Sequence, residues 1–269
     1  MELHRQINFE GKTLHYRDEG RGNQHVLVLI HGFLQNLDVW STYTLSYMRN
    51  MRVISVDLPG HGYSSTYGDT HTMEFMAKAV KNILDDAGVS QCVMVGHSLG
   101  GYVALEFAEN YPYMLKGLGL LHSHAMPDPP EKKNRRMEVC RQVEKNRPGY
   151  IVDFIPRLFY EGNRFALEQE IKDLRDQCLE TQTDGIIATQ RGMAQRKSHI
   201  DLLEKIKVPV MFIIGKNDPR FDFELAITEA MLPEISDVLI LNHVGHMAHI
   251  EAKDRVKNKI RSFVESCYN

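Results

Sequence analysis

Four short apolar runs constrain the fold of this 269-residue chain more than any other feature. They lie at residues 25–30, 52–57, 91–96 and 208–215, with weaker runs at 115–121 and 237–241. Continuous apolar runs of this length are typical of strands that are buried on both faces of a parallel sheet. Helical stretches alternate with them, at about 72–87, 99–110, 222–231 and 250–266. This alternation predicts an α/β fold with a mostly parallel sheet flanked by helices.

Two segments depart from this alternation. Residues 5–17 alternate apolar and polar side chains around Glu10 and Gly11, which predicts an antiparallel hairpin at the edge of the sheet. Residues 127–205 begin with three prolines and continue as charged helical stretches without a convincing strand. We therefore expect a core domain made of residues 1–126 and 206–269, with residues 127–205 inserted after the sixth strand as a helical cap over the strand ends.

The composition excludes several classes of protein. A formal net charge of −3 creates no global field that favours nucleic acid or an anionic membrane. The apolar runs are too short to span a bilayer. The four scattered cysteines form no CxxC pair, and the first residues include no apolar signal segment. These features predict a cytoplasmic protein with free thiols, and they leave the oligomeric state open.

The strongest chemical signal is the segment Gly96-His97-Ser98-Leu99-Gly100-Gly101, which follows an expected buried strand and opens an expected helix. This context is the one that a nucleophile elbow requires. The glycines allow a tight strand-to-helix turn, and the turn projects Ser98 away from the sheet. A serine that merely caps the helix is the alternative interpretation.

Together with this elbow, two further segments resemble the α/β-hydrolase superfamily over nearly the whole chain. His31-Gly32-Phe33 lies where that family has its oxyanion loop, and residues 57–64, DLPGHGYS, resemble its DxPGxGxS loop. The resemblance implies an α/β-hydrolase fold with a helical cap, in which the catalytic base follows the last strand. His246 fits this position and the family's GHxxxxE pattern, with His243 and His249 as rivals.

In the same family, the acid follows the preceding strand, and the chain order is serine, acid, histidine. Asp218 lies in the loop directly after the run at 208–215. Asp128 is the alternative acid, because some relatives place it after an earlier strand. Asp222 fits the N-terminus of a helix better, and Asp57 fits a structural role in its glycine-rich loop.

The remaining site residues follow from the same arrangement. The backbone N–H groups of Phe33 and Leu99 are the expected donors to an oxyanion. We expect the side chains of His31 and His97 to line the site. Phe154, Phe159 and Phe165 are candidates for lining an acyl pocket in the cap, together with Tyr160 and Met193.

Residues 132–147 carry seven lysines or arginines against two glutamates. They could attract an anionic substrate, although a solvated helix face is the simpler interpretation. We expect a serine hydrolase that cleaves a carboxylic ester or related acyl compound, a small-molecule substrate, without a metal or organic cofactor. A serine at the elbow argues against the epoxide-hydrolase and dehalogenase branches, which use an aspartate there.

Two alternatives remain open. The first is a lyase of menaquinone biosynthesis, which residues 31–34, 38–40 and 57–62 also resemble, although that family usually has an arginine where this chain has Tyr102. The second is a ligand-sensing protein that keeps the triad and signals through a partner.

Overall fold

The structure is a computed structural model that describes residues 4–269. Within this range, eight strands form one sheet: β1 (His4–Phe9), β2 (Lys12–Glu19), β3 (Val26–Ile30), β4 (Arg52–Val56), β5 (Cys92–His97), β6 (Leu115–Leu121), β7 (Val210–Gly215) and β8 (Ser236–Leu241). Their order is β1-β2-β4-β3-β5-β6-β7-β8, and all neighbours from β4 to β8 are parallel. The predicted α/β fold with a mostly parallel sheet is confirmed.

The edge of this sheet carries the hairpin expected from the sequence. β1 and β2 pair antiparallel, and β2 pairs antiparallel with β4. The chain reverses at Glu10 and Gly11, which both have a positive φ, of 48° and 81°. Glycine adopts this conformation without a steric cost, so the turn forms at the one glycine of the segment.

The fully buried strands have the clearest apolar runs in the sequence. Every residue of β3, β5 and β7 is buried, and all of these residues are apolar except His97 at the end of β5. In β8, at the far edge, exposed and half-buried residues alternate until the buried Leu241. An edge strand has one solvated face, and its sequence signal is correspondingly weaker.

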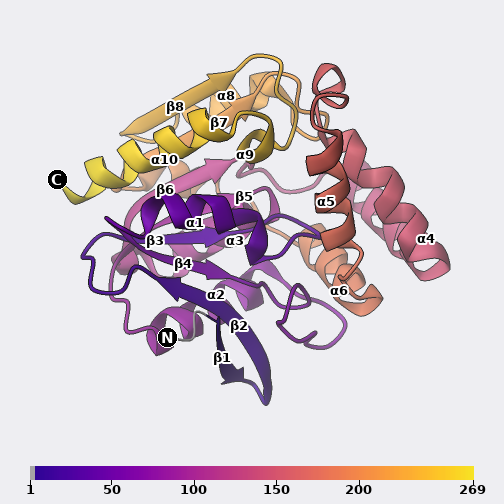
Figure 1. Ribbon diagram of the computed structural model, residues 1–269, viewed down its shortest axis with the longest axis horizontal. Helices are drawn as coiled ribbons and strands as arrows, with labels where there is room; N and C mark the ends of the chain where they lie inside the picture. The colour runs from indigo at the N-terminus through magenta and orange to yellow at the C-terminus, as the bar shows by residue number, and fades with distance from the viewer. Residues whose placement is uncertain (1–3) are drawn as a thin grey trace.

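Helices cover both faces of the sheet (Figure 1). On one face lie α2 (Met73–Asp86), α3 (Leu99–Asn110) and α8 (Phe223–Ala230). On the other lie α1 (Ser41–Tyr47) and α10 (Lys253–Tyr268), which follows the short α9 (Ala248–Glu251). The helix expected at 250–266 is therefore two helices. The sequence does not predict α1, because this helix buries tyrosine and threonine side chains, which have weaker helix propensity than leucine or methionine.

Between β6 and β7 the described chain forms four helices and no strand: α4 (Pro130–Phe154), α5 (Glu168–Cys178), α6 (Thr183–Ala194) and α7 (Ile200–Lys205). Short 3₁₀ turns lie at η1 (Leu37–Trp40), η2 (Pro112–Met114), η3 (Ile155–Leu158) and η4 (Glu161–Asn163). Helix α4 bends at Asn146, two residues before Pro148. Helices α4 to α6 share a hydrophobic cluster that also includes Leu34 and Met247.

Figure 1 shows α4, α5 and α6 gathered at one side of the molecule, beyond the carboxyl ends of the central strands. Ligand sites in open α/β sheets lie at these ends. Across residues 4–269, no helix has both the length and the apolar character needed to cross a membrane.

Candidate active site

Ser98 occupies the tight turn between β5 and α3, and its backbone has φ 50° and ψ −111°. A positive φ at a residue with a side chain costs free energy, so the surrounding structure must impose it. Two glycines make the turn possible. A Cβ on Gly96 would lie 2.2 Å from the Gly100 oxygen, and a Cβ on Gly100 would lie 2.4 Å from the Ile30 oxygen. The turn places Ser98 in the wall of a cavity of about 480 Å³.

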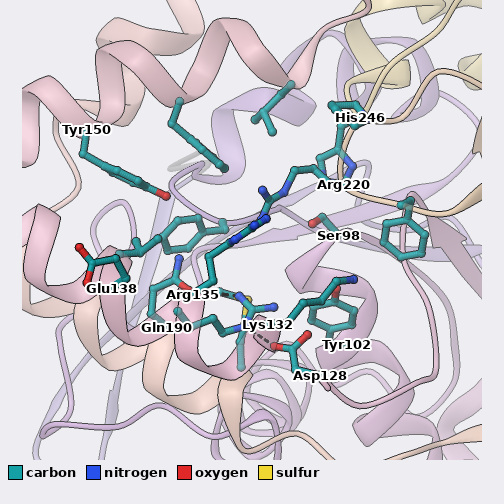
Figure 2. A pocket seen from close by; sticks show the side chains of 18 of the residues that line it. Ser98, Tyr102, Asp128, Lys132, Arg135, Glu138, Tyr150, Gln190, Arg220 and His246 are labelled. Atoms are coloured by element: carbon teal, nitrogen blue, oxygen red, sulfur yellow. Dashed lines mark hydrogen bonds and ion pairs between the residues drawn. The ribbon is translucent and has the colours of Figure 1, made fainter. Parts of the chain in front are cut away.

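His246, in the loop after β8, lines the same cavity. Its Nδ1 lies 2.8 Å from Oδ2 of Asp218, which follows β7. The structure therefore brings together the three side chains that the sequence assigned to one site (Figure 2 labels Ser98 and His246). Within the described chain, Ser98 Oγ forms no hydrogen bond. In sites without substrate, the bond between nucleophile and base often tightens only when substrate binds.

Glu251 braces the loop that carries the histidine. Its Oε1 accepts hydrogen bonds from the N–H groups of Gly245 (3.0 Å) and Met247 (3.2 Å), the two residues that flank the histidine. Its Oε2 accepts from the N–H of Tyr160 and from Nδ2 of Asn163, both at 2.9 Å. One carboxylate thus ties the loop after β8 to the segment after α4. It is the glutamate of the GHxxxxE pattern.

The protonation states of the pair follow from burial and mutual charge. Burial lowers the pKa of His246, and the charge of Asp218 offsets this only in part. Burial alone would raise the pKa of Asp218, but His246 and His122 hold that pKa well below its usual range. At neutral pH the carboxyl is therefore ionised and the imidazole of His246 is neutral, so its free nitrogen can accept a proton.

His122, which was not predicted from the sequence, is a second imidazole on the same carboxylate. Its Nδ1 lies 2.7 Å from Asp218 Oδ2, and its buried Nε2 has no hydrogen-bond partner among residues 4–269. The residue follows β6 directly and has a φ of 48°. Its position directly after β6 could have indicated this role, because residues at the carboxyl ends of adjacent parallel strands converge at one edge of the sheet.

The two rival histidines have other surroundings. His243 is exposed, and its N–H donates to Asn217 Oδ1 at 3.1 Å. His249 is buried against Trp40 and His97, with ring centroids 5.2 and 4.4 Å away, and burial lowers its pKa to about 3. Neither rival is hydrogen-bonded to the carboxylate that holds His246.

The alternative acids are also occupied elsewhere. Asp128 is buried and forms ion pairs with Arg136 and Arg196. Asp222 caps the N-terminus of α8, because its Oδ1 accepts a backbone N–H bond of 3.0 Å. Asp57 accepts two backbone N–H bonds, of 2.8 and 3.0 Å, from separate loops. The capping role of Asp222 and the structural role of Asp57 are confirmed.

Two backbone N–H groups near the elbow have no acceptor among residues 4–269. Leu99 is the first residue of α3, and Phe33 lies in the loop after β3. Neither N–H donates to another described residue, so both remain available. Gly32 permits the close approach of the two segments, because a Cβ there would lie 2.5 Å from His97 Nδ1.

His31 and His97 differ in position. His97 lines the cavity as expected, and its Nε2 lies 3.0 Å from the backbone oxygen of His246. The expectation that His31 lines the site is wrong. The His31 side chain is fully buried and is not part of the cavity wall, and its Nε2 accepts the N–H of Leu58 at 3.0 Å. It links the loops after β3 and β4.

Of the three phenylalanines expected in a pocket, only Phe154 lines the cavity. The expectation is wrong for the other two. Phe159 is 1% exposed and packs inside the hydrophobic cluster of α4 to α6, whereas Phe165 is 92% exposed. The periodicity of the sequence did not distinguish these positions, because η3 and η4 interrupt the helices there.

Residues 25–139 match the model of a protein family described as having the alpha/beta hydrolase fold. The whole chain is also similar to a thermophilic esterase from Thermogutta terrifontis, whose structure was solved with malate bound. The TM-score is 0.92 and the identity is 29%, over 100% of both chains. The chain belongs to the α/β-hydrolase superfamily.

Two relatives extend this comparison. The chain is 22% identical to an (E)-2-((N-methylformamido)methylene)succinate hydrolase from Acinetobacter baylyi, over 95% of each protein. It is 26% identical to a Bacillus subtilis protein provisionally named 2-succinyl-6-hydroxy-2,4-cyclohexadiene-1-carboxylate synthase, over 91% of this chain and 92% of that protein.

Further residues of this α/β-hydrolase complete the cavity wall, and most come from α4 or from the loop after β7. Among them, Met193 was expected to line a pocket, and Asp128 and Lys132 were noted for other reasons. They are Gln35, Tyr102, Asp128, Lys132, Arg135, Arg136, Glu138, Val139, Gln142, Tyr150, Leu158, Gln190, Met193, Pro219, Arg220 and Phe221, beside Phe33.

Two groups in this α/β-hydrolase have residue types that hold metals: His122, Asp218 and His246, and Glu106, Glu109 and His199. In the first group, both imidazoles are already hydrogen-bonded to the carboxylate. In the second, the Lys197 ammonium lies 3.0 and 2.7 Å from the two carboxylates, where a metal ion would bind. Both groups fit hydrogen-bonded networks better than metal centres.

Proposed function

We propose that this protein is a serine hydrolase that cleaves a carboxylic ester or related acyl compound through an acyl-enzyme intermediate. One observation carries the proposal. His246, whose Nδ1 lies 2.8 Å from Asp218 Oδ2, lines the same cavity as a serine held at φ 50° between a buried strand and a helix. A serine is a poor nucleophile without a base, and here an oriented imidazole lies in the same cavity.

The reaction follows the two stages of a catalytic triad. Ser98 Oγ attacks the acyl carbon while His246 Nε2 takes its proton. The tetrahedral intermediate then expels the alcohol, which receives that proton from the histidine. Water attacks the acyl-serine in the second stage, again losing a proton to His246. The acid departs, and the proton returns to Ser98. Asp218 remains ionised and stabilises the imidazolium in both stages.

The negative oxygen of each tetrahedral intermediate needs two converging donors. We assign the free N–H groups of Phe33 and Leu99 to this role. Donors of this kind typically contribute about 100- to 1000-fold in rate each. Because they are backbone groups, substitution of the Phe33 side chain tests its packing and not its hydrogen bond.

We further propose that residues 1–126 and 206–269 form the catalytic core and that residues 127–205 act as a cap that selects a small-molecule substrate. Helix α4 supplies several residues of the cavity wall but none of the three catalytic side chains. The hydrogen bond from the His246 N–H to the Leu158 oxygen, 2.7 Å long, couples the cap to the base.

The names of the relatives favour hydrolysis, since they include an esterase and a succinate-derivative hydrolase. A second candidate is a carbon–carbon lyase of the same fold, which the similarity to the provisionally named synthase and a cationic cavity favour. Tyr102 stands where that lyase family usually has arginine, which favours the ester reaction.

A panel of p-nitrophenyl esters of increasing chain length, assayed with the wild type and with Ser98→Ala, tests the proposal. We expect repeated turnover of at least one ester and a loss of about 1000-fold or more in kcat for the variant. A variant that keeps a tenth of the activity would exclude Ser98 as the nucleophile. Turnover that stops after one equivalent would instead indicate a ligand-sensing protein.

A further inference from the structure

The wall of the cavity carries more positive than negative charge. Four cationic side chains line it: Lys132, Arg135, Arg136 and Arg220. Two acidic side chains, Asp128 and Glu138, lie in the same wall. An excess of one charge inside a partly enclosed space raises the concentration of oppositely charged molecules there.

Both carboxylates are already paired with other cations. Asp128 is buried and binds the guanidinium groups of Arg136 and Arg196. Glu138 forms an exposed ion pair of 2.6 Å with Arg141. Neither therefore neutralises the three remaining cations of the cavity.

These three cations are Lys132, Arg135 and Arg220. None of them has a carboxylate within ion-pair distance among residues 4–269. Burial lowers the pKa of Lys132, and the charges of Arg196, Arg136 and Arg220 lower it further against the opposing effect of Asp128. The ammonium group thus lies among three guanidinium groups and one carboxylate.

The three side chains come from two separate segments and converge on one space. Lys132 and Arg135 lie in the first turns of α4, and Arg220 follows the catalytic acid in the loop after β7. The Arg220 guanidinium lies 5.5 Å from the centre of the Phe154 ring, which supports it from one side. Figure 2 shows the side chains of Arg135 and Arg220 extending toward one another inside the cavity that Ser98 lines.

A solvated helix face explains Lys133, which does not line the cavity. It does not explain why a loop of the core domain adds Arg220 to the cations of α4. Two guanidinium groups that converge without an acid between them repel each other, and an anion placed there would relieve that repulsion. Guanidinium groups match the planar, two-oxygen geometry of a carboxylate particularly well.

We propose that the substrate is an ester that carries a free carboxylate, which binds between Arg135, Arg220 and Lys132 while the ester carbonyl faces Ser98. This inference rests on the proposed hydrolase function and adds the class of its substrate. Binding requires no further reaction step, and the ester is cleaved as described above.

Two matched pairs of esters test the inference. In the first pair the charge is on the acyl part: 4-nitrophenyl hydrogen adipate is compared with the neutral amide 4-nitrophenyl adipamate. In the second pair it is on the alcohol: 4-carboxyphenyl hexanoate is compared with 4-carbamoylphenyl hexanoate. The anionic member of at least one pair should have a kcat/KM at least about tenfold higher at low salt, as expected for a charge-assisted hydrogen bond. Added NaCl should reduce this preference.

Substitutions distinguish the effect of the cavity cations on the preference for anionic esters from the effect of the general charge of the protein. In Arg220→Gln and Arg135→Gln, the ratio of anionic to neutral kcat/KM should fall by about tenfold, because one charge-assisted contact is lost. Lys133→Gln removes the same charge from the outer face of the same helix, and it should leave the ratio unchanged. An equal loss of the ratio in Lys133→Gln would overturn the site, since the effect would then be a general one.

The outcomes distinguish this inference from the proposed function. Equal kcat/KM values within both pairs, with turnover that depends on Ser98, would overturn the anionic substrate and leave the hydrolase standing. Absence of all turnover would count against the hydrolase. In that case, calorimetry with Ser98→Ala still tests whether the cavity binds the carboxylate. A Kd about tenfold lower for the carboxylate ester than for its amide supports the site, and equal Kd values refute it.

Discussion

Replacement of Glu251 by alanine should destabilise the protein and slow catalysis together. The carboxylate accepts four hydrogen bonds of 2.9 to 3.2 Å, and two of the donors are the backbone N–H groups of the buried Gly245 and Met247. Each buried donor that loses the carboxylate and cannot bind water instead lowers the free energy of unfolding by about 1–3 kcal/mol. The two half-buried donors can bind water instead, so the total should be about 3–5 kcal/mol in the free energy of unfolding.

The same change should reduce kcat by about 10- to 100-fold, because the two buried donors flank His246 and a small displacement of a catalytic group is costly. Glu251→Gln should lose less stability, about 2 kcal/mol, since its amide oxygen can keep two of the donors.

Urea unfolding and steady-state ester hydrolysis measure the two effects. Glu234→Ala is the matched control, because it removes a glutamate whose ion pair with Lys207 is largely exposed. It should change the stability by less than about 0.5 kcal/mol. If Glu251→Ala unfolds at the wild-type urea concentration and keeps the wild-type kcat, the bracing role described here is wrong.

Four further predictions concern the base, its acid and two aromatic rings outside the cavity. His246→Ala should lower kcat by about 1000-fold or more, whereas His243→Ala should change it by less than about threefold; the reverse order would reassign the base. In the wild type, kcat/KM should rise with pH through a pKa below the usual value for imidazole, because only neutral imidazole accepts the serine proton. His122→Leu removes one hydrogen bond from Asp218, whose carboxylate then stabilises the His246 imidazolium more strongly. The pKa of His246 should therefore rise, and the rise of kcat/KM should move to higher pH. An unchanged pH profile would show that His122 does not affect the pKa of His246. Phe159→Ala should lower the free energy of unfolding by about 3–5 kcal/mol, because the ring is 1% exposed. Phe165→Ala should lower it by less than about 0.5 kcal/mol, because the ring is 92% exposed. Thermal unfolding measures both changes.

Local sequence patterns predicted the sheet and the positions of the three catalytic candidates well. Ser98 lies in a six-residue motif whose glycines are required by contacts of 2.2 to 2.4 Å, so these glycines mark the turn in the sequence. Asp218 and His246 follow strands that are recognisable from apolar runs. Each position depends on a strand end, and strand ends are marked by the change from apolar to polar residues.

The residues that surround these three were harder to predict, because their roles depend on contacts between distant segments. His122 is 96 residues from the carboxylate that it binds. Arg220 and Arg135 line one cavity only because α4 and the loop after β7 lie close together in space. Phe159 and Phe165 have the same chemistry and lie six residues apart, yet one is buried and the other exposed. No periodicity in the sequence separates such positions.

Mass spectrometry of the protein after reaction with a fluorophosphonate tests the central claim most directly. Such a probe reacts only with a serine that a nearby base has activated. The account predicts one covalent group per chain, located by peptide mapping at Ser98, and no labelling in Ser98→Ala or after heat denaturation. A label at Ser64 or Ser123, or no label on folded wild-type protein that hydrolyses esters, would contradict it.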